Sequence, residues 1–71
     1  MVKNLYKGMF QFPLKTYIER VMAYSELQAK VVMAQRLAKK QDRLPVEVMS
    51  WMKENPDNYE ILLEVKYEEE E

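Results

Sequence analysis

Apolar residues recur at helical spacing from Leu14 to about Lys40. This stretch holds no glycine, no proline and few β-branched residues, a composition that favours helix. In its first half the apolar residues lie within one arc of a helical wheel, which predicts an amphipathic helix packed on a core. The arc contains Leu14, Tyr17, Ile18, Val21, Met22 and Tyr24. Ser25 to Gln28 matches a capping box, so the pattern is compatible with one helix over 14–40 or with two helices that separate at Tyr24 and Ser25.

The second half of this stretch is apolar on nearly every side of the wheel. Only a narrow sector, formed by Gln28, Gln35 and Lys39, has no apolar side chain. A helix of this kind is buried on nearly all sides, and a chain of 71 residues has few elements with which to cover it. We therefore expect a homodimer or another protein partner here, with a central helix wrapped by the rest of the chain as the alternative. The predicted interface residues are Val31, Met33, Ala34, Leu37 and Ala38.

Residues 2–12 are predicted to form an extended N-terminal arm. Short alternating pieces on either side of Lys7 and Gly8, the only glycine, also fit two strands joined by a turn at that point. Pro13 ends the segment, because a proline restricts the residue before it to extended geometry and suits the first turn of a following helix.

The C-terminal third contains a short helix and an ambiguous segment. Pro45 begins a predicted helix over 45–54, and the turn-forming residues 55–58 end it. Residues 59–67 alternate apolar and polar side chains, which favours a strand. A helix capped by Asp57, with Glu60 three residues later, is the alternative for this segment.

These elements predict a helix-dominated α+β fold in a single small domain over residues 1–67. The expected order is an extended arm, a long helical region that is continuous or broken, a short third helix and a C-terminal strand. An all-α helical bundle is the alternative if residues 59–67 are helical. Residues 68–71 are four consecutive glutamates, which repel one another and are expected to form a disordered acidic tail.

The composition argues against an enzyme. The chain contains no cysteine and no histidine, which removes disulfides, thiolate metal sites and the commonest general base. A single glycine leaves no phosphate-binding loop. Ser50 and Lys53 fit the S-x-x-K pattern of serine acyl-enzymes, but the companion motifs are missing from the chain. We expect no catalytic residue, no metal, no cofactor and no small-molecule substrate.

The charge is divided along the chain. Residues 1–43 carry nine Lys and Arg against three acids, whereas residues 44–71 carry two Lys against nine acids. The basic half suggests a nucleic-acid-binding regulator as one alternative function. Its candidate residues are Lys3, Lys7, Lys30, Arg36, Lys39, Lys40 and Arg43.

The acidic half suggests a different alternative, an inhibitor that imitates a phosphate track and docks on a basic surface of a target protein. Its candidate residues are Glu60, Glu64, Glu68, Glu69, Glu70 and Glu71. No apolar run approaches the roughly 20 residues needed to cross a bilayer, and the N-terminus lacks the apolar core of a signal peptide. We expect a cytoplasmic protein without a membrane partner, and our main hypothesis is a non-catalytic regulator that acts through a helical protein-protein surface.

Overall fold

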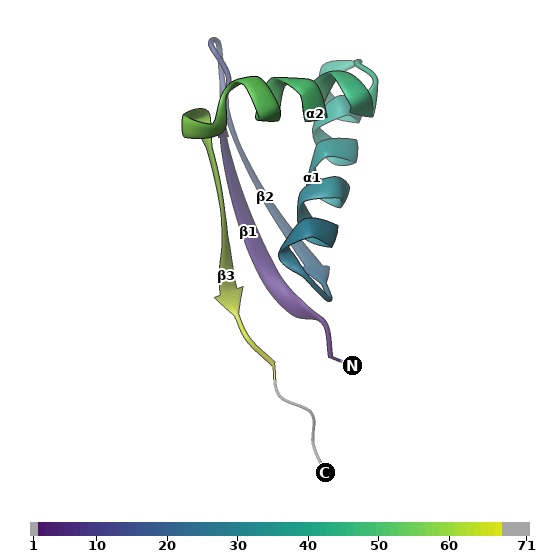
Figure 1. The fold of residues 1–71 in the computed structure, drawn as a ribbon, viewed down its shortest axis with the longest axis vertical. Helices are drawn as coiled ribbons and strands as arrows, with labels where there is room; N and C mark the ends of the chain where they lie inside the picture. The colour runs from purple at the N-terminus through teal and green to yellow at the C-terminus, as the bar shows by residue number, and fades with distance from the viewer. Residues whose placement is uncertain (1, 68–71) are drawn as a thin grey trace.

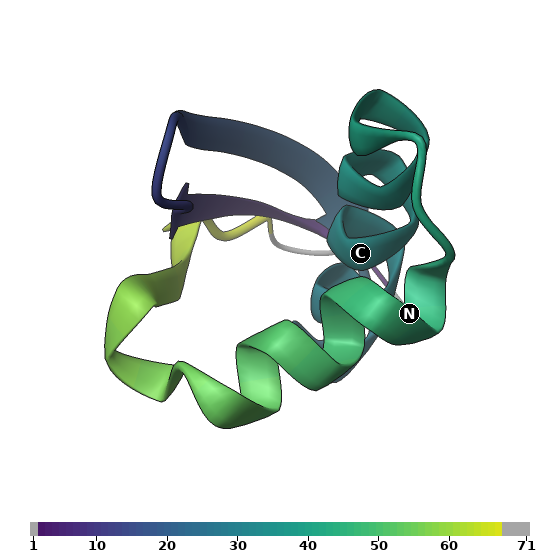
Figure 2. The same ribbon diagram turned by 90° about the horizontal axis from the view of Figure 1, so that it is seen from above.

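The computed structural model describes residues 2–67, which form a sheet covered on one face by two helices (Figure 1). The elements are β1 (Asn4–Gln11), β2 (Thr16–Ala23), α1 (Glu26–Gln41), α2 (Pro45–Glu54), the 3-10 turn η1 (Pro56–Asn58) and β3 (Tyr59–Val65). The three strands are antiparallel and lie in the order β2-β1-β3, so β1 is central. Figure 2 shows α1 and α2 on the same side of the sheet, with α2 running from the end of α1 towards β3.

The predicted fold class is wrong in its helical region. Residues 2–67 form a small α+β fold with 44% helix and 35% strand. Within them there is no long or broken helix over 14–40, and the fold is not a helical bundle. Residues 16–23 form β2 and pair with β1 along their whole length. Tyr17, Val21 and Ala23 point towards the helices, whereas the apolar Ile18 and Met22 lie on the other face of the sheet. Because apolar residues lie on both faces of β2, its sequence does not alternate between apolar and polar residues as a half-exposed strand does. The helix-forming composition therefore decided the prediction.

The N-terminal arm is the central strand of the sheet. Gly8 lies in the middle of β1 and not in a turn. The turn lies at Pro13 and Leu14, where Phe12 and Lys15 exchange two backbone hydrogen bonds, from Phe12 N to Lys15 O at 3.0 Å and from Lys15 N to Phe12 O at 3.3 Å. The proline that was expected to begin a helix instead forms the tip of a two-residue hairpin loop.

The capping signal at the start of α1 is confirmed. Ser25 is the N-cap, and its Oγ accepts a hydrogen bond from the Gln28 backbone N–H at 3.1 Å. The Gln28 side chain reaches back and accepts from the Tyr24 backbone N–H at 2.7 Å. At the other end, Asp42 adopts a left-handed conformation with φ 55°, and its N–H donates to the carbonyls of Ala38 and Lys39.

The two C-terminal predictions are also confirmed. A helix spans Pro45–Glu54, and Tyr59–Val65 is a strand. β3 pairs with β1 of its own chain, which provides the partner that this strand needs. The tail predicted at 68–71 lies outside the described residues. Neither described helix combines the length and apolar character that crossing a bilayer would need.

The core lies between the sheet and the helices. Its fully buried side chains are Phe10, Val21, Ala23, Ala29, Met33, Ala34, Leu37, Ala38, Val48 and Met52. An aromatic group closes the core under α2, where the rings of Phe12 and Trp51 stack with their centroids 3.9 Å apart. Phe10 stacks on Tyr59 at 5.9 Å, and this contact fixes β3 against β1. The helices therefore cover one face of the sheet and none of the core lies on the other.

Candidate protein-interaction surface

The face of the sheet that points away from the helices is here called the open face. Side chains alternate between the two faces of a sheet, so the register assigns its residues. They are Leu5, Lys7, Met9 and Gln11 from β1, Thr16, Ile18, Arg20 and Met22 from β2, and Glu60, Leu62 and Val65 from β3. The register shifts between Leu63 and Val65, and the ion pair with Arg20 places Glu64 on the same face. No described helix or loop covers this face (Figure 2).

Apolar side chains occupy much of the open face. Ile18, Met22 and Leu62 are 49%, 46% and 41% exposed, although each belongs to a regular strand. On the central strand Leu5 lies beside Met22 and Met9 lies beside Ile18, both half-buried, and the Arg20–Lys7 pair separates these two apolar pairs. An antiparallel sheet with one solvated face normally carries polar residues there. Exposed apolar side chains gathered on such a face mark a candidate interaction surface.

The charged residues of the open face are arranged by sign. Lys7 and Arg20 lie side by side on β1 and β2, while Glu60 and Glu64 lie on β3. Arg20 Nε donates to Glu64 Oε1 at 3.1 Å and to Oε2 at 3.4 Å. This ion pair joins the two outer strands, so the Arg20 side chain crosses over central strand β1. The face is basic on its β2 side and acidic on its β3 side.

Four of the five residues predicted for a helical interface are inside the subunit. Met33, Ala34, Leu37 and Ala38 are 0–1% exposed, and only Val31, at 38%, reaches the surface. The sheet covers one side of α1 and α2 covers a second side, so the single chain shelters the apolar residues of this helix. The chain leaves apolar side chains exposed on the sheet, at Ile18, Met22 and Leu62, and also outside it, at Leu14, Leu27, Leu44 and Val46.

The structure separates the predicted nucleic-acid residues. Lys7 is on the open face, whereas Lys30, Arg36, Lys39 and Lys40 are on α1, on the other side of the sheet. Lys3 precedes β1, and Arg43 follows α1.

Three of the cations on α1 already have partners within the chain. Arg36 Nη1 donates to the Arg20 carbonyl at 3.0 Å, and Lys40 forms an ion pair with Glu19, which is 5% exposed. The Lys30 ammonium lies 5.5 Å from the centre of the Tyr59 ring. These cations therefore stabilise the fold, and they do not form one continuous basic surface with Lys7.

The predicted acidic residues are divided between described and undescribed parts of the chain. Glu60 and Glu64 lie on the open face of β3, and Glu64 is the partner of Arg20. The four terminal glutamates, 68–71, lie outside the described residues.

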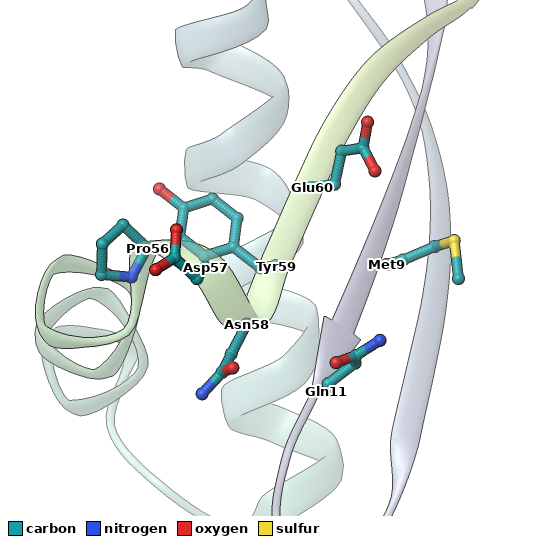
Figure 3. Close-up of a pocket in the computed structure, with 7 residues that line it drawn as sticks. All are labelled: Met9, Gln11, Pro56, Asp57, Asn58, Tyr59 and Glu60. Carbon is teal, nitrogen blue, oxygen red and sulfur yellow. The ribbon is translucent and has the colours of Figure 1, made fainter.

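A shallow hollow of about 310 Å³ adjoins the open face beside η1 (Figure 3). Met9, Gln11, Tyr59 and Glu60 line it from the sheet, and Pro56, Asp57 and Asn58 line it from the turn. Its polar groups are carboxylates, amides and the Tyr59 hydroxyl, which can accept or donate hydrogen bonds. Within residues 2–67, no group of three or more His, Cys, Asp or Glu side chains is placed to hold a metal ion.

Sequence reasoning missed the apolar residues of the open face. Ile18 and Met22 were assigned to the core side of a helix that does not exist, and Leu5 and Met9 were not singled out. A usable signal was present, because Thr16–Ala23 contains the β-branched Thr16, Ile18 and Val21 within eight residues. Comparison with known protein families, with curated proteins and with solved structures finds no match for this chain.

Proposed function

We propose that this chain is a non-catalytic interaction protein that forms a homodimer through the open face of its sheet. The observation that supports this proposal is the apolar group Ile18, Met22 and Leu62, exposed on a sheet face that the chain itself does not cover. Burying apolar surface stabilises an association by roughly 25 cal/mol per Å² before the costs of association are subtracted. A second sheet packed on this face would remove these side chains from water.

The size of the face predicts a weak dimer. A strand of 8 residues is roughly 26 Å long, and three strands are roughly 14 Å wide, from the usual rise and strand spacing. Two such faces together cover roughly 750 Å² in projection, which is below the approximately 1,000 Å² of a secure interface. We therefore expect association that depends on concentration in the micromolar range and above.

The charges of the open face are compatible with this dimer. A two-fold axis parallel to the strands would place β3 of one copy over β2 of the other, so Glu64 would lie near Arg20 of the second copy. Opposite charges placed in this way set the orientation of two subunits more than they add affinity. Lys7, on the central strand, would lie near the axis, where its ammonium must reach the glutamates of the opposing β3.

Sedimentation velocity over a range of concentrations tests this proposal. Ile18→Lys should shift the protein towards monomer, because it places a charge in the apolar patch. Leu14→Lys is the matched control, since Leu14 is fully exposed at the hairpin tip and away from the patch. Lys7→Met should strengthen the dimer by removing a charge that must otherwise be desolvated. A wild-type protein that remains a monomer at millimolar concentration would exclude the homodimer, and circular dichroism of each variant checks that the fold is retained.

The nucleic-acid alternative has less support, because its basic residues lie on both sides of the sheet and several have partners within the chain. Titration with single- and double-stranded nucleic acid at about 50 mM salt tests it, with an expected salt slope of roughly −0.9 per phosphate contacted on duplex DNA. The acidic-inhibitor alternative predicts that removal of residues 68–71 lowers affinity for a basic target without changing the stability of the fold.

A further inference from the structure

The outer edge of β3 carries main-chain groups that are free to pair with another strand. Paired residues in an antiparallel ladder alternate between hydrogen-bonded and non-hydrogen-bonded positions. Phe12 and Lys15 exchange two main-chain hydrogen bonds, so they form a hydrogen-bonded pair at the end of the β1–β2 ladder. Counting back along β1 from this pair, the N–H and C=O groups of the even-numbered residues point to β2. Those of the odd-numbered residues point to β3. Lys7 and Met9 pair with Leu62 and Glu60. The N–H and C=O groups of the alternate residues Tyr59, Ile61 and Leu63 therefore point outwards.

The two edges of the sheet differ in how they are protected. By the same alternation, the Arg20 carbonyl on β2 points outwards, and Arg36 of α1 donates to it at 3.0 Å. A side chain in this position opposes the addition of a strand at β2. Within residues 2–67, no side chain forms a hydrogen bond with the outward groups of Tyr59, Ile61 or Leu63.

A hollow on the helix side adjoins the β3 edge. It has a volume of about 260 Å³ and is lined by Glu26, Leu27, Lys30, Tyr59 and Ile61. Leu27 is 68% exposed, so apolar surface borders the hollow. Glu26 and Lys30 carry opposite charges at its rim, which leaves the hollow without a strong preference for either sign. Side chains of an added strand that point to this side would meet apolar surface.

The other side of the β3 edge is acidic. Glu60 and Glu64 project onto the open face, and β3 contains no Lys or Arg. Arg20 already pairs with Glu64, so Glu60 is the carboxylate that an added strand would meet. Opposite charges that face each other on neighbouring strands attract and stabilise the pairing of those strands. An added strand should therefore carry basic residues on this side and apolar residues on the hollow side.

We propose that the outer edge of β3 binds an extended segment of another protein in which basic and apolar residues alternate, as a fourth strand of the sheet. Main-chain hydrogen bonds to Tyr59, Ile61 and Leu63 provide the affinity, and the alternation provides the specificity. This site is separate from the open-face dimer, which leaves the β3 edge free. A second copy of β3 is a poorer occupant, because full antiparallel overlap centred on Leu62 places Glu60 opposite Glu64 of the other copy.

A synthetic peptide tests this site. The probe is an acetylated and amidated seven-residue peptide of alternating Lys and Val, compared with its Glu-Val counterpart and with a Lys-Val peptide that has proline at its centre. Amide hydrogen exchange of the ¹⁵N-labelled full chain is measured with each peptide by NMR. The Lys-Val peptide should slow exchange at Tyr59, Ile61 and Leu63, whereas the peptide with proline should not, because proline lacks a donor.

Charge reversal on the protein supplies the matched control. Glu60→Lys should lower the affinity of the protein for the Lys-Val peptide about fivefold, from the usual strength of a cross-strand charge pair. The same variant should bind the Glu-Val peptide more tightly. Glu54→Lys makes the same change on α2, outside β3, and should leave both affinities unchanged. Protection at Ile18 and Arg20, or equal binding of both peptides, would overturn the assignment.

Pairing of the β3 edge with β3 of a second copy would give a different result in the exchange experiment. Protection of Tyr59, Ile61 and Leu63 that grows with protein concentration in the absence of peptide would assign the edge to a second copy and would also overturn the proposal. The Ile18→Lys variant should still bind the Lys-Val peptide, so failure of the open-face dimer and failure of this site are distinguishable.

Discussion

Gly8→Ala should destabilise this protein through a collision that the structure locates. Gly8 is buried in the middle of β1, where Met33 of α1 lies over it. A Cβ atom at this position would lie 2.5 Å from Met33 Sδ, 2.6 Å from Phe10 Cε2 and 2.9 Å from Phe10 Cζ. Comfortable contacts between such atoms are about 3.5–4.0 Å, so the neighbours must move by about 1 Å. Phe10 has little room to move, because it is fully buried and stacked on Tyr59.

Two opposing effects determine how far Gly8→Ala lowers the free energy of unfolding. Overpacking a filled core costs about 1–3 kcal/mol. Replacing a glycine within a strand returns about 0.5–1 kcal/mol, because alanine has less freedom in the unfolded chain. The free energy of unfolding should therefore fall by up to about 2.5 kcal/mol. In a domain of this size each kcal/mol lowers the melting temperature by about 4–8 °C.

Urea unfolding followed by fluorescence measures this loss. Trp51 is the only tryptophan and stacks on Phe12, so its emission reports on the core. Repeating Gly8→Ala in a Met33→Ala background supplies the control, since removal of the thioether gives the new methyl group space. The cost of Gly8→Ala should be smaller there by about 1 kcal/mol, the scale of coupling between residues in contact. An equal cost in both backgrounds, or a stabilised Gly8→Ala variant, would refute this explanation.

Three further substitutions are tested by the same urea measurement. Asp42→Gly should raise the free energy of unfolding by about 0.5–1 kcal/mol, because Asp42 has φ 55° and glycine adopts this conformation without strain. An unchanged free energy of unfolding would mean that the aspartate side chain compensates for the strain. Lys40→Met should lower the free energy of unfolding by about 1–3 kcal/mol, because it leaves the buried Glu19 without its ion pair. The loss should be smaller than that for a fully buried ion pair, because Lys40 is half-exposed. Adding Glu19→Gln to Lys40→Met should recover most of that loss, and an unchanged stability in the single variant would contradict the role of the ion pair. Ser25→Ala should cost about 1 kcal/mol by removing the hydrogen bond to the Gln28 N–H, whereas Ser50→Ala, on the exposed side of α2, should have little effect.

The elements that could be predicted carry their signals in neighbouring residues. Ser25 and Gln28 mark the start of α1, and Pro45 marks the start of α2. Pro56 and its neighbours mark the turn before β3. Capping and turn chemistry act within about one helical turn, so one stretch of sequence is enough to read them.

β2 could not be predicted in the same way, because its partner determines it. Thr16–Ala23 has enough helix-forming residues to suggest a helix, yet it pairs with Asn4–Gln11 through a hairpin loop. Intrinsic preference for helix is weak, and tertiary contacts override it. The error moved Ile18 and Met22 from an exposed sheet face to a core that they do not enter, and it concealed the candidate surface.

The candidate surface depended on the same long-range pairing. The sequence indicated more apolar residues than so short a chain normally covers, and it assigned the excess to Val31–Ala38. The fold buries Met33 and Leu37 between the sheet and α2, and leaves Ile18 and Leu62 in water. Hydrophobic burial has no direction, so an apolar residue does not itself specify the layer that covers it.

By itself, the sequence determined the charge division, the absence of cysteine and histidine and the limits of α2. These properties follow from composition or from interactions between near neighbours. The sequence offered Ser25 as one possible start of a helix and favoured a strand over a helix at 59–67, and the structure decided both. Tertiary structure alone decided that β1 is the central strand, that Arg36 protects the β2 edge, and that β3 and one sheet face remain uncovered. Each of those outcomes depends on residues more than ten positions apart meeting in space, and the pairing of such residues is set by the whole chain.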